Sequence, residues 1–354
     1  MKTALVYDRI NKFGGAERVL LALHEIFPDA PLYTSVYDSI AAPWAKVFDV
    51  RTSFIQKLPI PKTAHEYYPF LMGSAFETFN FDEYDVVISM THEFAKAIIT
   101  KPQTKHICYC LTPTSYLWSG YDQYFSNKPF LKFISKPMIN YLRWYDKIIC
   151  HRPDRYIAIS KTVQNRIKKY YGLESDVIYP PVDLARGPLA KQEDLFFLIV
   201  SRLVPNKRID IAVKAFNKLG LPLKIIGSGR ELNRLKNLSK NNIEFLGHLT
   251  DEQVKGYYER CRAVIIPGED DFNIVAVEAQ SYGKPVIAYR AGGVTETVIE
   301  NKTGYFFNEQ TVESLTETVQ KFKSLKSTDC VANAQKYSKE RFKQEFLNYV
   351  LQHC

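Results

Sequence analysis

Strand-like and helix-like patterns alternate along most of the chain, and this alternation limits the folds that it can adopt. Short apolar runs such as "TALVY", "DVVISM" and "RYIAIS" are separated by longer patterns of helical period such as "AERVLLALHEIF" and "KTVQNRIKKYYG". Strands that alternate with helices form parallel sheets, which need helices to cover their faces. The sequence therefore predicts an α/β protein with parallel sheets.

The same alternation starts again in the second half of the chain, with "LFFLIVSRL", "RIDIAVKAFNKL", "LKIIG" and "PVIAY". Pro180-Pro181 and the polar residues up to Asp194 have the composition of a linker. A length of 354 residues also favours two domains. We expect two facing Rossmann-like domains, 1–183 and 184–336, and a last helix at about 337–354 that can pack back on the first.

Composition excludes several classes of protein. With 46% hydrophobic and 24% charged residues, the chain is typical of a globular protein. Its six cysteines are scattered without a CxxC pair, which favours a reducing cytosol over a zinc site or a disulfide scaffold. The apolar start is too short for a signal peptide, and no apolar run is long enough to span a membrane.

Positive charge is concentrated in one window, Lys128 to Lys169. This window contains eleven Lys or Arg against two Asp, a balance of +9, in a chain whose net charge is also +9. Aromatic residues are interleaved with the cations in "KPFLKFISKPMINYLRWY". The pattern is typical of a surface that rests on an anionic membrane and equally of a solvated amphipathic helix. Nucleic acid is not expected as a partner, since no recognition motif accompanies the charge.

Two cations occupy a loop where ligands of α/β proteins usually bind. Arg202 and Lys207, in "SRLVPNKRID", follow a buried strand and precede a helix. Arginine offers a bidentate fork and lysine a point charge, so the pair suits a diphosphate. The alternative is two solvated side chains, but their place at the carboxyl end of a strand favours a binding role.

Glycines follow two of the predicted strands. Gly14 and Gly15, in "NKFGGAERVL", lie where the backbone can approach a phosphate or a sugar closely, although a plain tight turn explains them equally. Neither they nor Gly227 and Gly229 complete a GxGxxG motif, which argues against a dinucleotide-binding dehydrogenase. No Walker lysine, HExxH or GxSxG motif occurs either.

Four acids lie in the segment "PGEDDFNIVAVEAQSYGKPVIAY", and three of them are candidates for a role: Asp270, Asp271 and Glu278. Asp270 and Asp271 precede a helix that begins at about Asn273, where they can cap the helix or hold a metal, and capping is the simpler interpretation. Glu278 lies within the helix, which is apolar on most sides and therefore expected to be buried. A buried carboxylate needs donors, either from the protein or from the hydroxyls of a ligand.

Taken together, several segments resemble the retaining glycosyltransferases of family 4, which have the GT-B fold. The segments are "GGAERVL", "SRLVPNKRID", "FLGHLTDEQV", "PGEDDFNIVAVEAQSYGKPVIA" and "AGGVTETVIENKTGYFF". Three others, "VISMTHEFAK", "HICYCLTPTSYLW" and "IAISKTVQNRIKKYYG", are similar to the mannosyltransferase-like branch that builds bacterial surface polysaccharides. The order and spacing match over nearly the whole chain.

The resemblance implies a role for each candidate residue. Glu278 accepts hydrogen bonds from the ribose hydroxyls, and Asp270, separated from it by seven residues as in the family, contacts the donor sugar. Arg202 and Lys207 form the diphosphate clamp and, with the two acids, the catalytic set. The remaining residues of the nucleotide-sugar site are the amides near Phe272, Asn273 and Ile274, which hold a phosphate, together with Gly14, Gly15 and Gly227.

Three departures from the family pattern concern the same sites. Asp270 stands where Glu is usual, Asn273 where Gly is usual, and Leu111 where His is usual near the reacting sugar. Leucine can neither donate, accept nor carry a proton. His92 also lies near a strand end and is a candidate to assist on the acceptor side, although a lone histidine is more often structural. The Leu111 change affects either the rate or the choice of acceptor.

The resemblance therefore implies a glycosyltransferase at the cytosolic face of the membrane that transfers a hexose from a nucleotide diphosphate sugar to a glycan or lipid-linked glycan. Retention is expected without a protein nucleophile, a cofactor or a metal, because the leaving diphosphate helps to deprotonate the acceptor. GDP-mannose is the first candidate donor, and UDP-sugars remain open. The alternatives are a nucleotide-sugar-binding protein that has lost transfer activity and a GT-B epimerase, which "GGVTETV" and the acid spacing disfavour.

Overall fold

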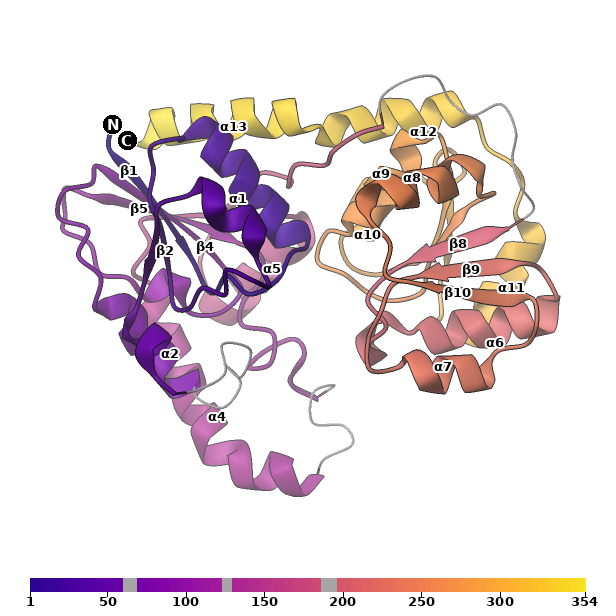
Figure 1. Ribbon diagram of the computed structural model, residues 1–354, viewed down its shortest axis with the longest axis horizontal. Coiled ribbons are helices and arrows are strands. Elements are labelled where there is room, and N and C mark those ends of the chain that lie inside the picture. Colours follow the sequence, from indigo (N-terminus) through magenta and orange to yellow (C-terminus); the bar gives the residue numbers. More distant parts are fainter. Residues whose placement is uncertain (60–68, 123–128, 186–195) are drawn as a thin grey trace. The chain divides into compact units, whose positions relative to one another are not determined.

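A computed structural model describes residues 1–59, 69–122, 129–185 and 196–354, which form two units (Figure 1). Unit 1 contains residues 1–181 and 342–354, and unit 2 contains residues 182–341. The sequence places the boundaries at 183 and 336, so the observed divisions lie two residues earlier and five residues later. Most of the expected linker, 186–194, lies outside the described residues, as does Lys128.

The described part of unit 1 is built on seven parallel strands in the order β3-β2-β1-β4-β5-β6-β7. Leu5 of β1 pairs with Leu32 on one side and with Ile88 on the other. The prediction of a parallel sheet is thus confirmed for the first half of the chain. In chain order the strands are β1 (Thr3–Tyr7), β2 (Leu32–Thr34), β3 (Val50–Thr52), β4 (Val86–Thr91), β5 (Lys105–Cys110), β6 (Arg155–Ala158) and β7 (Asp176–Val177).

Helices cover both faces of this sheet. They are α1 (Gly15–Ile26), α2 (Pro69–Glu77), α4 (Pro129–Ile149), α5 (Lys161–Tyr171) and α13 (Lys339–His353). On one face, Ile139 of α4 and Phe76 of α2 share a core with Val6 of β1. Side chains alternate between the faces of a strand, so Tyr109 of β5 points to the other face. There its ring lies 5.9 Å from that of Phe342 in α13. The last helix therefore packs on the first sheet.

The described part of unit 2 contains six parallel strands in the order β10-β9-β8-β11-β12-β13. Figure 1 shows β8, β9 and β10 side by side with α6 and α7 below them. In chain order the strands are β8 (Phe197–Val200), β9 (Leu223–Ile226), β10 (Ile243–Gly247), β11 (Val264–Ile266), β12 (Val286–Tyr289) and β13 (Gly304–Phe307). The parallel sheet predicted for the second half is also confirmed.

Unit 2 has a core on each side of its sheet. Ile199 and Ile265 pack with Phe216 of α6 on one side, and Leu198 and Val264 pack with residues of α8 and α9 on the other. The helices of this unit are α6 (Ile209–Leu219), α7 (Leu232–Leu238), α8 (Asp251–Arg260), α9 (Ile274–Ser281), α10 (Val294–Thr297), α11 (Val312–Lys321) and α12 (Ser327–Ala334). Both sheets are thus three-layered, as in the Rossmann-like arrangement that the alternation predicts.

Local sequence signals account for several helix ends. The hydroxyl of Ser160 accepts a hydrogen bond from the amide of Val163 at the start of α5, and Gly172 ends this helix at φ 71°. Thr250 and Gln253 form a capping box at the start of α8. Within the described ranges, no helix is long and apolar enough to cross a membrane.

Candidate functional site

The cations and acids expected to bind a nucleotide sugar lie together at the carboxyl edge of the sheet of unit 2. Arg202 and Lys207 lie in the loop between β8 and α6, and Asp270 lies in the loop between β11 and α9. β8 and β11 are neighbours, and the carboxyl ends of parallel strands meet at the same edge. The ammonium of Lys207 contacts Oδ1 of Asp270 directly, and both side chains are largely buried. The structure thus joins a clamp residue to the first of the two acids.

Close packing of glycine backbone holds these loops together. Gly292, after β12, has φ 74°, and a Cβ atom at this position would lie 2.3 Å from the carbonyl oxygen of Asp270. At Gly227, after β9, φ is 136° and a Cβ would lie 1.9 Å from the carbonyl oxygen of Ser201. No larger residue fits either place without moving the backbone. Gly227 therefore has a structural role beside the Arg202 loop, whether or not it also contacts a ligand.

Arg202 is exposed at this edge. Its guanidinium forms no hydrogen bond or ion pair with any residue in the described part of the chain. Lys207, by contrast, is already neutralised by Asp270. The two members of the expected clamp thus differ: one is available to an anion, and the other must exchange its carboxylate partner for a phosphate.

Asn273 explains two departures from the family pattern at once. Its backbone has φ 70°, a left-handed conformation that glycine adopts easily and that asparagine tolerates better than most residues. Its Oδ1 accepts a hydrogen bond from the amide of Ala276, 3.1 Å away, and thereby caps α9. Its Nδ2 donates to Oδ2 of Asp270 at 3.0 Å. The shorter acid is therefore held by the side chain that replaces the usual glycine.

The expectation that Asp270 and Asp271 cap this helix is wrong, since Asn273 is its N-cap. Phe272 is buried, with its ring 5.6 Å from that of Tyr337, and Ile274 is half-buried. The first amides of α9 have no carbonyl partner within the helix, as at any helix start. They lie beside Asp270, where an anion can accept from them. None of the described residues forms a cluster of side chains suited to a metal.

Glu278 is half-buried in α9, not buried as the sequence suggested. Val275 and Tyr282, which share its face, are also half-buried, so this face of the helix is only partly covered. The hydroxyl of Tyr258 in α8 donates to Oε2 of Glu278 at 3.0 Å. The rings of Tyr258 and Tyr282 stack with centroids 5.3 Å apart. Tyr258 is a member of the site that the sequence did not indicate, because twenty residues separate it from Glu278.

The glycines of unit 1 lie beside an acid. Gly14 is the N-cap of α1 in an extended conformation, and Gly15 begins the helix. The carboxylate of Glu17, in the first turn, is buried and accepts a hydrogen bond from the hydroxyl of Tyr7 at 2.7 Å. Burial and Glu17 both raise the pKa of Tyr7 well above its usual range. A negative charge therefore already occupies the end of α1 where a phosphate was expected.

His92 and Leu111 lie side by side at the ends of β4 and β5, since the amide of Leu111 donates to the carbonyl of Thr91. The imidazole lies 3.2 Å from Oδ2 of Asp8 through Nδ1 and 3.2 Å from Nη2 of Arg9 through Nε2. A guanidinium can only donate, so Nε2 accepts and the proton resides on Nδ1. Burial lowers the pKa of His92, although Asp8 favours protonation.

These neighbours of His92 form a buried polar network that the sequence did not indicate. Arg9 Nη1 lies 2.5 Å from Oε2 of Glu93. Asp8 accepts from the amides of Phe94 and Ala95 at 2.9 and 2.8 Å. Asp8 and Arg9 directly follow β1, and that position is the only signal that could have identified them. Both ring nitrogens of His92 are engaged within unit 1, so its function on the acceptor side would require Arg9 to move.

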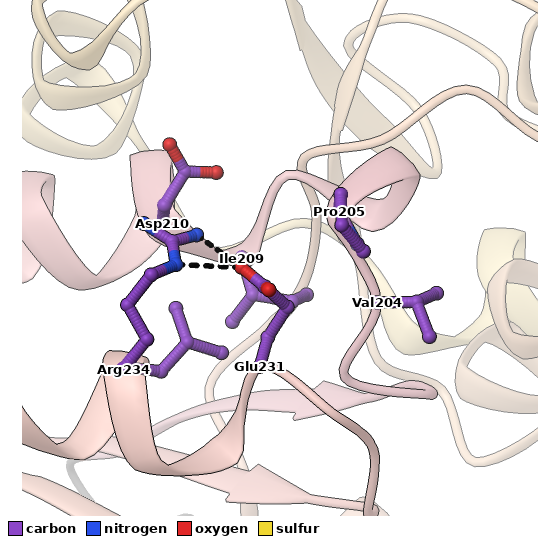
Figure 2. A pocket seen from close by; sticks show the side chains of 7 residues that line it. Val204, Pro205, Ile209, Asp210, Glu231 and Arg234 are labelled. Carbon is purple, nitrogen blue, oxygen red and sulfur yellow. Dashed lines mark hydrogen bonds and ion pairs between the residues drawn. The ribbon is translucent and has the colours of Figure 1, made fainter. Parts of the chain in front are cut away.

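A hollow of about 140 Å³, which is open to solvent, lies beside the Arg202 loop, and Figure 2 shows the side chains that line it. Val204, Pro205 and Ile209 form its apolar part, and an ion pair between Arg234 and Glu231, with a nitrogen–oxygen distance of 2.5 Å, lies across it. This volume is smaller than that of most ligand pockets. The hollow is therefore a feature of the surface between the loop and α7, separate from the Lys207–Asp270 contact.

Comparison with known protein families assigns both halves of the chain. The description "Glycosyltransferase Family 4" matches residues 13–186, and "Glycosyl transferases group 1" matches residues 183–341. The chain belongs to the family 4 glycosyltransferases. In this family 4 glycosyltransferase, Arg202, Lys207, Asp270 and Glu278 all fall within the second of the two matched regions.

This chain matches curated relatives over about half of their own length or less. An uncharacterized glycosyltransferase of Methanocaldococcus jannaschii is 31% identical over 183 residues, which cover 50% of this chain and 52% of the relative. A GDP-mannose-dependent alpha-(1-6)-phosphatidylinositol monomannoside mannosyltransferase of Mycobacterium tuberculosis is 29% identical over 170 residues, which cover 42% of this chain and 44% of the relative.

Solved structures match the whole chain in fold. Anabaena HepE in complex with UDP has a TM-score of 0.73 at 18% identity and covers 99% of this chain and 100% of its own. Sucrose-phosphate synthase from Thermosynechococcus elongatus has a TM-score of 0.77 at 16% identity and covers 99% of both chains. Both consist of the same pair of α/β units, and the predicted GT-B fold is confirmed.

Proposed function

We propose that this family 4 glycosyltransferase transfers a hexose from a nucleotide diphosphate sugar to a glycan or lipid-linked glycan, with retention of configuration at the anomeric carbon. The observation that carries the proposal is the convergence of Arg202, Lys207 and Asp270 at one edge of unit 2, with Glu278 in the helix that follows the Asp270 loop. Two cations suit a diphosphate, and two carboxylates suit the hydroxyls of two sugars, the ribose and the hexose.

Each residue has a distinct task in this proposal. Glu278, oriented by Tyr258, accepts from the ribose hydroxyls, and Asp270 accepts from hydroxyls of the donor hexose. Arg202 and Lys207 neutralise the charge that develops on the departing diphosphate, with help from the amides at the start of α9. Catalysis then consists mainly of positioning and electrostatic stabilisation, and the leaving phosphate takes the proton of the acceptor hydroxyl. The residues named here need no metal for these tasks.

GDP-mannose is the donor that we propose first. The GDP-mannose-dependent relative in Mycobacterium tuberculosis supports this choice. The complex of Anabaena HepE with UDP supports a uridine nucleotide instead, so UDP-hexoses form the second choice. On the acceptor side, Leu111 supplies an apolar contact where the family usually has histidine, and His92 lies beside it with both ring nitrogens engaged.

Leu111 also motivates the second candidate, a nucleotide-sugar-binding protein that has lost transfer. Such a protein would retain the clamp and both acids while lacking a polar group at the reacting sugar. We further propose that the acceptor is reached at the inner face of a membrane, with the basic window 128–169 on an anionic lipid surface.

A panel of nucleotide sugars tests the proposal. The purified chain is first screened for thermal stabilisation by GDP-mannose, UDP-glucose, UDP-galactose and ADP-glucose, because a ligand that binds only the folded state raises the melting temperature. The stabilising donor is then incubated with membrane extract and with soluble oligosaccharides, and the anomeric configuration of the product is read by NMR. A retained linkage supports the proposal. Donor binding without hydrolysis or transfer to any acceptor indicates the second candidate, and an inverted product contradicts the mechanism.

A further inference from the structure

The outward face of α4 carries a continuous row of large apolar side chains in contact with solvent. These residues recur at helical spacings of three and four, and between 42% and 77% of each is exposed. An exposed apolar patch of this kind marks an interaction site. We name it the outer stripe, and its members are Phe130, Phe133, Ile134, Met138, Tyr141, Trp144 and Ile148.

The outer stripe is not a core face that has been left uncovered, because α4 has a separate inner face. Ile139, Leu142 and Ile149 of the inner face are buried in the core of unit 1. Asp146, on the same side, is completely buried and lies 2.8 Å from the ammonium of Lys96. None of the described side chains between 130 and 138 is buried, and Figure 1 shows the first turns of α4 extending away from the sheet of unit 1.

Cations follow one edge of the outer stripe, and carboxylates are absent from it. Lys132, Lys136, Arg143 and Lys147 lie along this edge, whereas Asp146, the one acid in the sequence of α4, points inward. Three of the cations are already engaged within the protein. Lys132 pairs with Asp122 at 2.8 Å, and Arg143 and Lys147 lie over the rings of Tyr121 and Trp118 at 4.4 and 5.7 Å. Simple charge attraction is therefore weaker than the count of cations in the window suggests.

We propose that the outer stripe enters the boundary between headgroups and acyl chains of an anionic bilayer, with α4 lying parallel to the membrane surface. This inference deepens the membrane docking proposed above, since it assigns the contact to one helix face and makes apolar burial its main component. Aromatic and aliphatic side chains flanked by lysines are the composition of helices that lie in this interface. The row of cations contacts the anionic headgroups. A purely apolar protein partner would leave these cations without a counter-charge.

Vesicle binding by paired variants tests this inference. The whole protein is sedimented with phosphatidylcholine vesicles that contain about 30% or no phosphatidylglycerol, and quenching of tryptophan emission by brominated lipids is compared between the wild type and Trp144→Ser, since Trp44 and Trp118 also emit. We expect Phe133→Ser with Trp144→Ser to weaken binding to anionic vesicles by at least about tenfold, because two large side chains no longer leave water. Lys136→Gln with Lys147→Gln should lower only the preference for anionic lipid. Ile40→Ser with Leu351→Ser, which changes equally exposed apolar residues elsewhere in unit 1, should bind as the wild type does.

Three results would overturn the inference. The first is wild-type binding by the Phe133/Trp144 variant. The second is a loss of vesicle binding in the lysine variant as large as the loss in the Phe133/Trp144 variant, which would make charge the main component. The third is a dimer in sedimentation velocity that the Phe133/Trp144 substitutions dissociate, without vesicle binding, which would assign the stripe to a second copy of the chain. Hydrolysis of the donor sugar, measured on the same samples, separates failure of this inference from failure of the proposed transfer reaction.

Discussion

At the scale of single residues, Asp270 is held on both of its oxygens before any ligand arrives. Lys207 engages Oδ1 and Asn273 engages Oδ2. A donor that binds through its phosphates must draw Lys207 away from Asp270, and the carboxylate then needs new donors. The hydroxyls of a hexose supply them, whereas a free nucleoside diphosphate brings only further negative charge. Under the proposed function, Asp270 would therefore favour the sugar-bearing substrate over the product.

This arrangement predicts that Asp270→Asn binds free nucleoside diphosphate about tenfold more tightly, since a nearby like charge has been removed. Its affinity for the nucleotide sugar should be unchanged or lower, because the amide accepts fewer hydrogen bonds. Calorimetric titration with both ligands measures the ratio. Glu269→Gln removes an exposed charge from the same loop and serves as the control. Equal changes for the two ligands in Asp270→Asn would contradict the prediction.

Asn273→Gly should shift the same ratio in the opposite direction, because the loop keeps its left-handed backbone while the carboxylate of Asp270 keeps its charge and loses one donor. The chain offers a matched control in Asn301, which also has a left-handed backbone, with φ 61°, in the turn before β13. Asn301→Gly should alter stability slightly and leave both affinities unchanged. If the two substitutions change the ratio of affinities equally, the introduced glycine is the cause and not the lost contact with Asp270.

The proposed diphosphate clamp gives a second prediction at this scale. Arg202→Ala and Lys207→Ala should each lower turnover by about 30- to 1,000-fold, because one charge-assisted contact to a leaving group stabilises the transition state by roughly 2–4 kcal/mol. Steady-state rates at saturating donor measure this loss. Lys214→Ala, an exposed cation on α6, is the control and should keep the wild-type rate. Normal rates in both clamp variants would remove the diphosphate assignment.

The family resemblance assigned Lys207 and Asp270 to one site, and the structure brings them together because both follow strands whose carboxyl ends share one edge. The same reasoning could not find Tyr258 or the Asn273–Asp270 contact. Tyr258 reaches Glu278 from another helix, and the hydrogen bond of Asn273 depends on a left-handed backbone that no sequence pattern specifies. The burial of Glu278 was overestimated because helical period shows which residues share a face, but not how far neighbouring helices cover it.

At the scale of elements, α4 depends on one buried ion pair. Asp146 accepts from Lys96, from Nε1 of Trp118 at 2.7 Å and from the hydroxyl of Tyr171 at 2.9 Å. Its carboxylate thus connects α4 to α5 and to the loop after β5. The amphipathic window predicted a helix here, but Pro137 in its interior favours a break, and only the structure shows a single element.

Loss of one partner from this pair should be costly. Asp146→Asn leaves the ammonium of Lys96 buried without a counter-charge, and we expect the free energy of unfolding to fall by about 3–5 kcal/mol. Lys96→Met combined with Asp146→Asn should recover most of this loss, because no charge then remains buried and the amide oxygen still accepts from Trp118 and Tyr171. Urea denaturation measures both. Asp122→Asn, which breaks the exposed pair with Lys132, provides the surface control and should change little. A double variant as unstable as Asp146→Asn would show that packing, and not charge, is responsible.

At the scale of the whole molecule, the two units should respond differently to acid. Burial and the nearby charge of Arg152 lower the pKa of His106 in unit 1 to about 3, against an ordinary value of 6.5. The unfolded chain therefore binds a proton that the folded chain does not, and stability falls as the pH drops from 6.5 towards 3. The loss at pH 5 is about 2 kcal/mol, from 1.36 kcal/mol for each pH unit. In unit 2 the sequence has one histidine, His248, and it is exposed.

Hydrogen exchange followed by mass spectrometry at pH 7.5 and pH 5 tests this difference. Peptides of the first sheet should lose protection at pH 5 before peptides of unit 2 do. His106→Gln should reduce the pH dependence, whereas His151→Gln, at an exposed position, should not. Earlier opening of unit 2, or an unchanged slope in His106→Gln, would contradict the assignment.

The return of the chain to unit 1 through α13 affects the order in which the protein can be made. Unit 2 is continuous in sequence, and its ends are joined where the amide of Val182 donates to the carbonyl of Tyr337 at 3.0 Å. Unit 1 lacks Phe342 and Phe346, the neighbours of Tyr109, until the last helix has been translated. Although domains generally fold in the order of synthesis, here the half that leaves the ribosome first is completed last. The sheet of unit 1 therefore stays incomplete during synthesis, with Tyr109 uncovered, until the residues of unit 2 and the last helix have been translated.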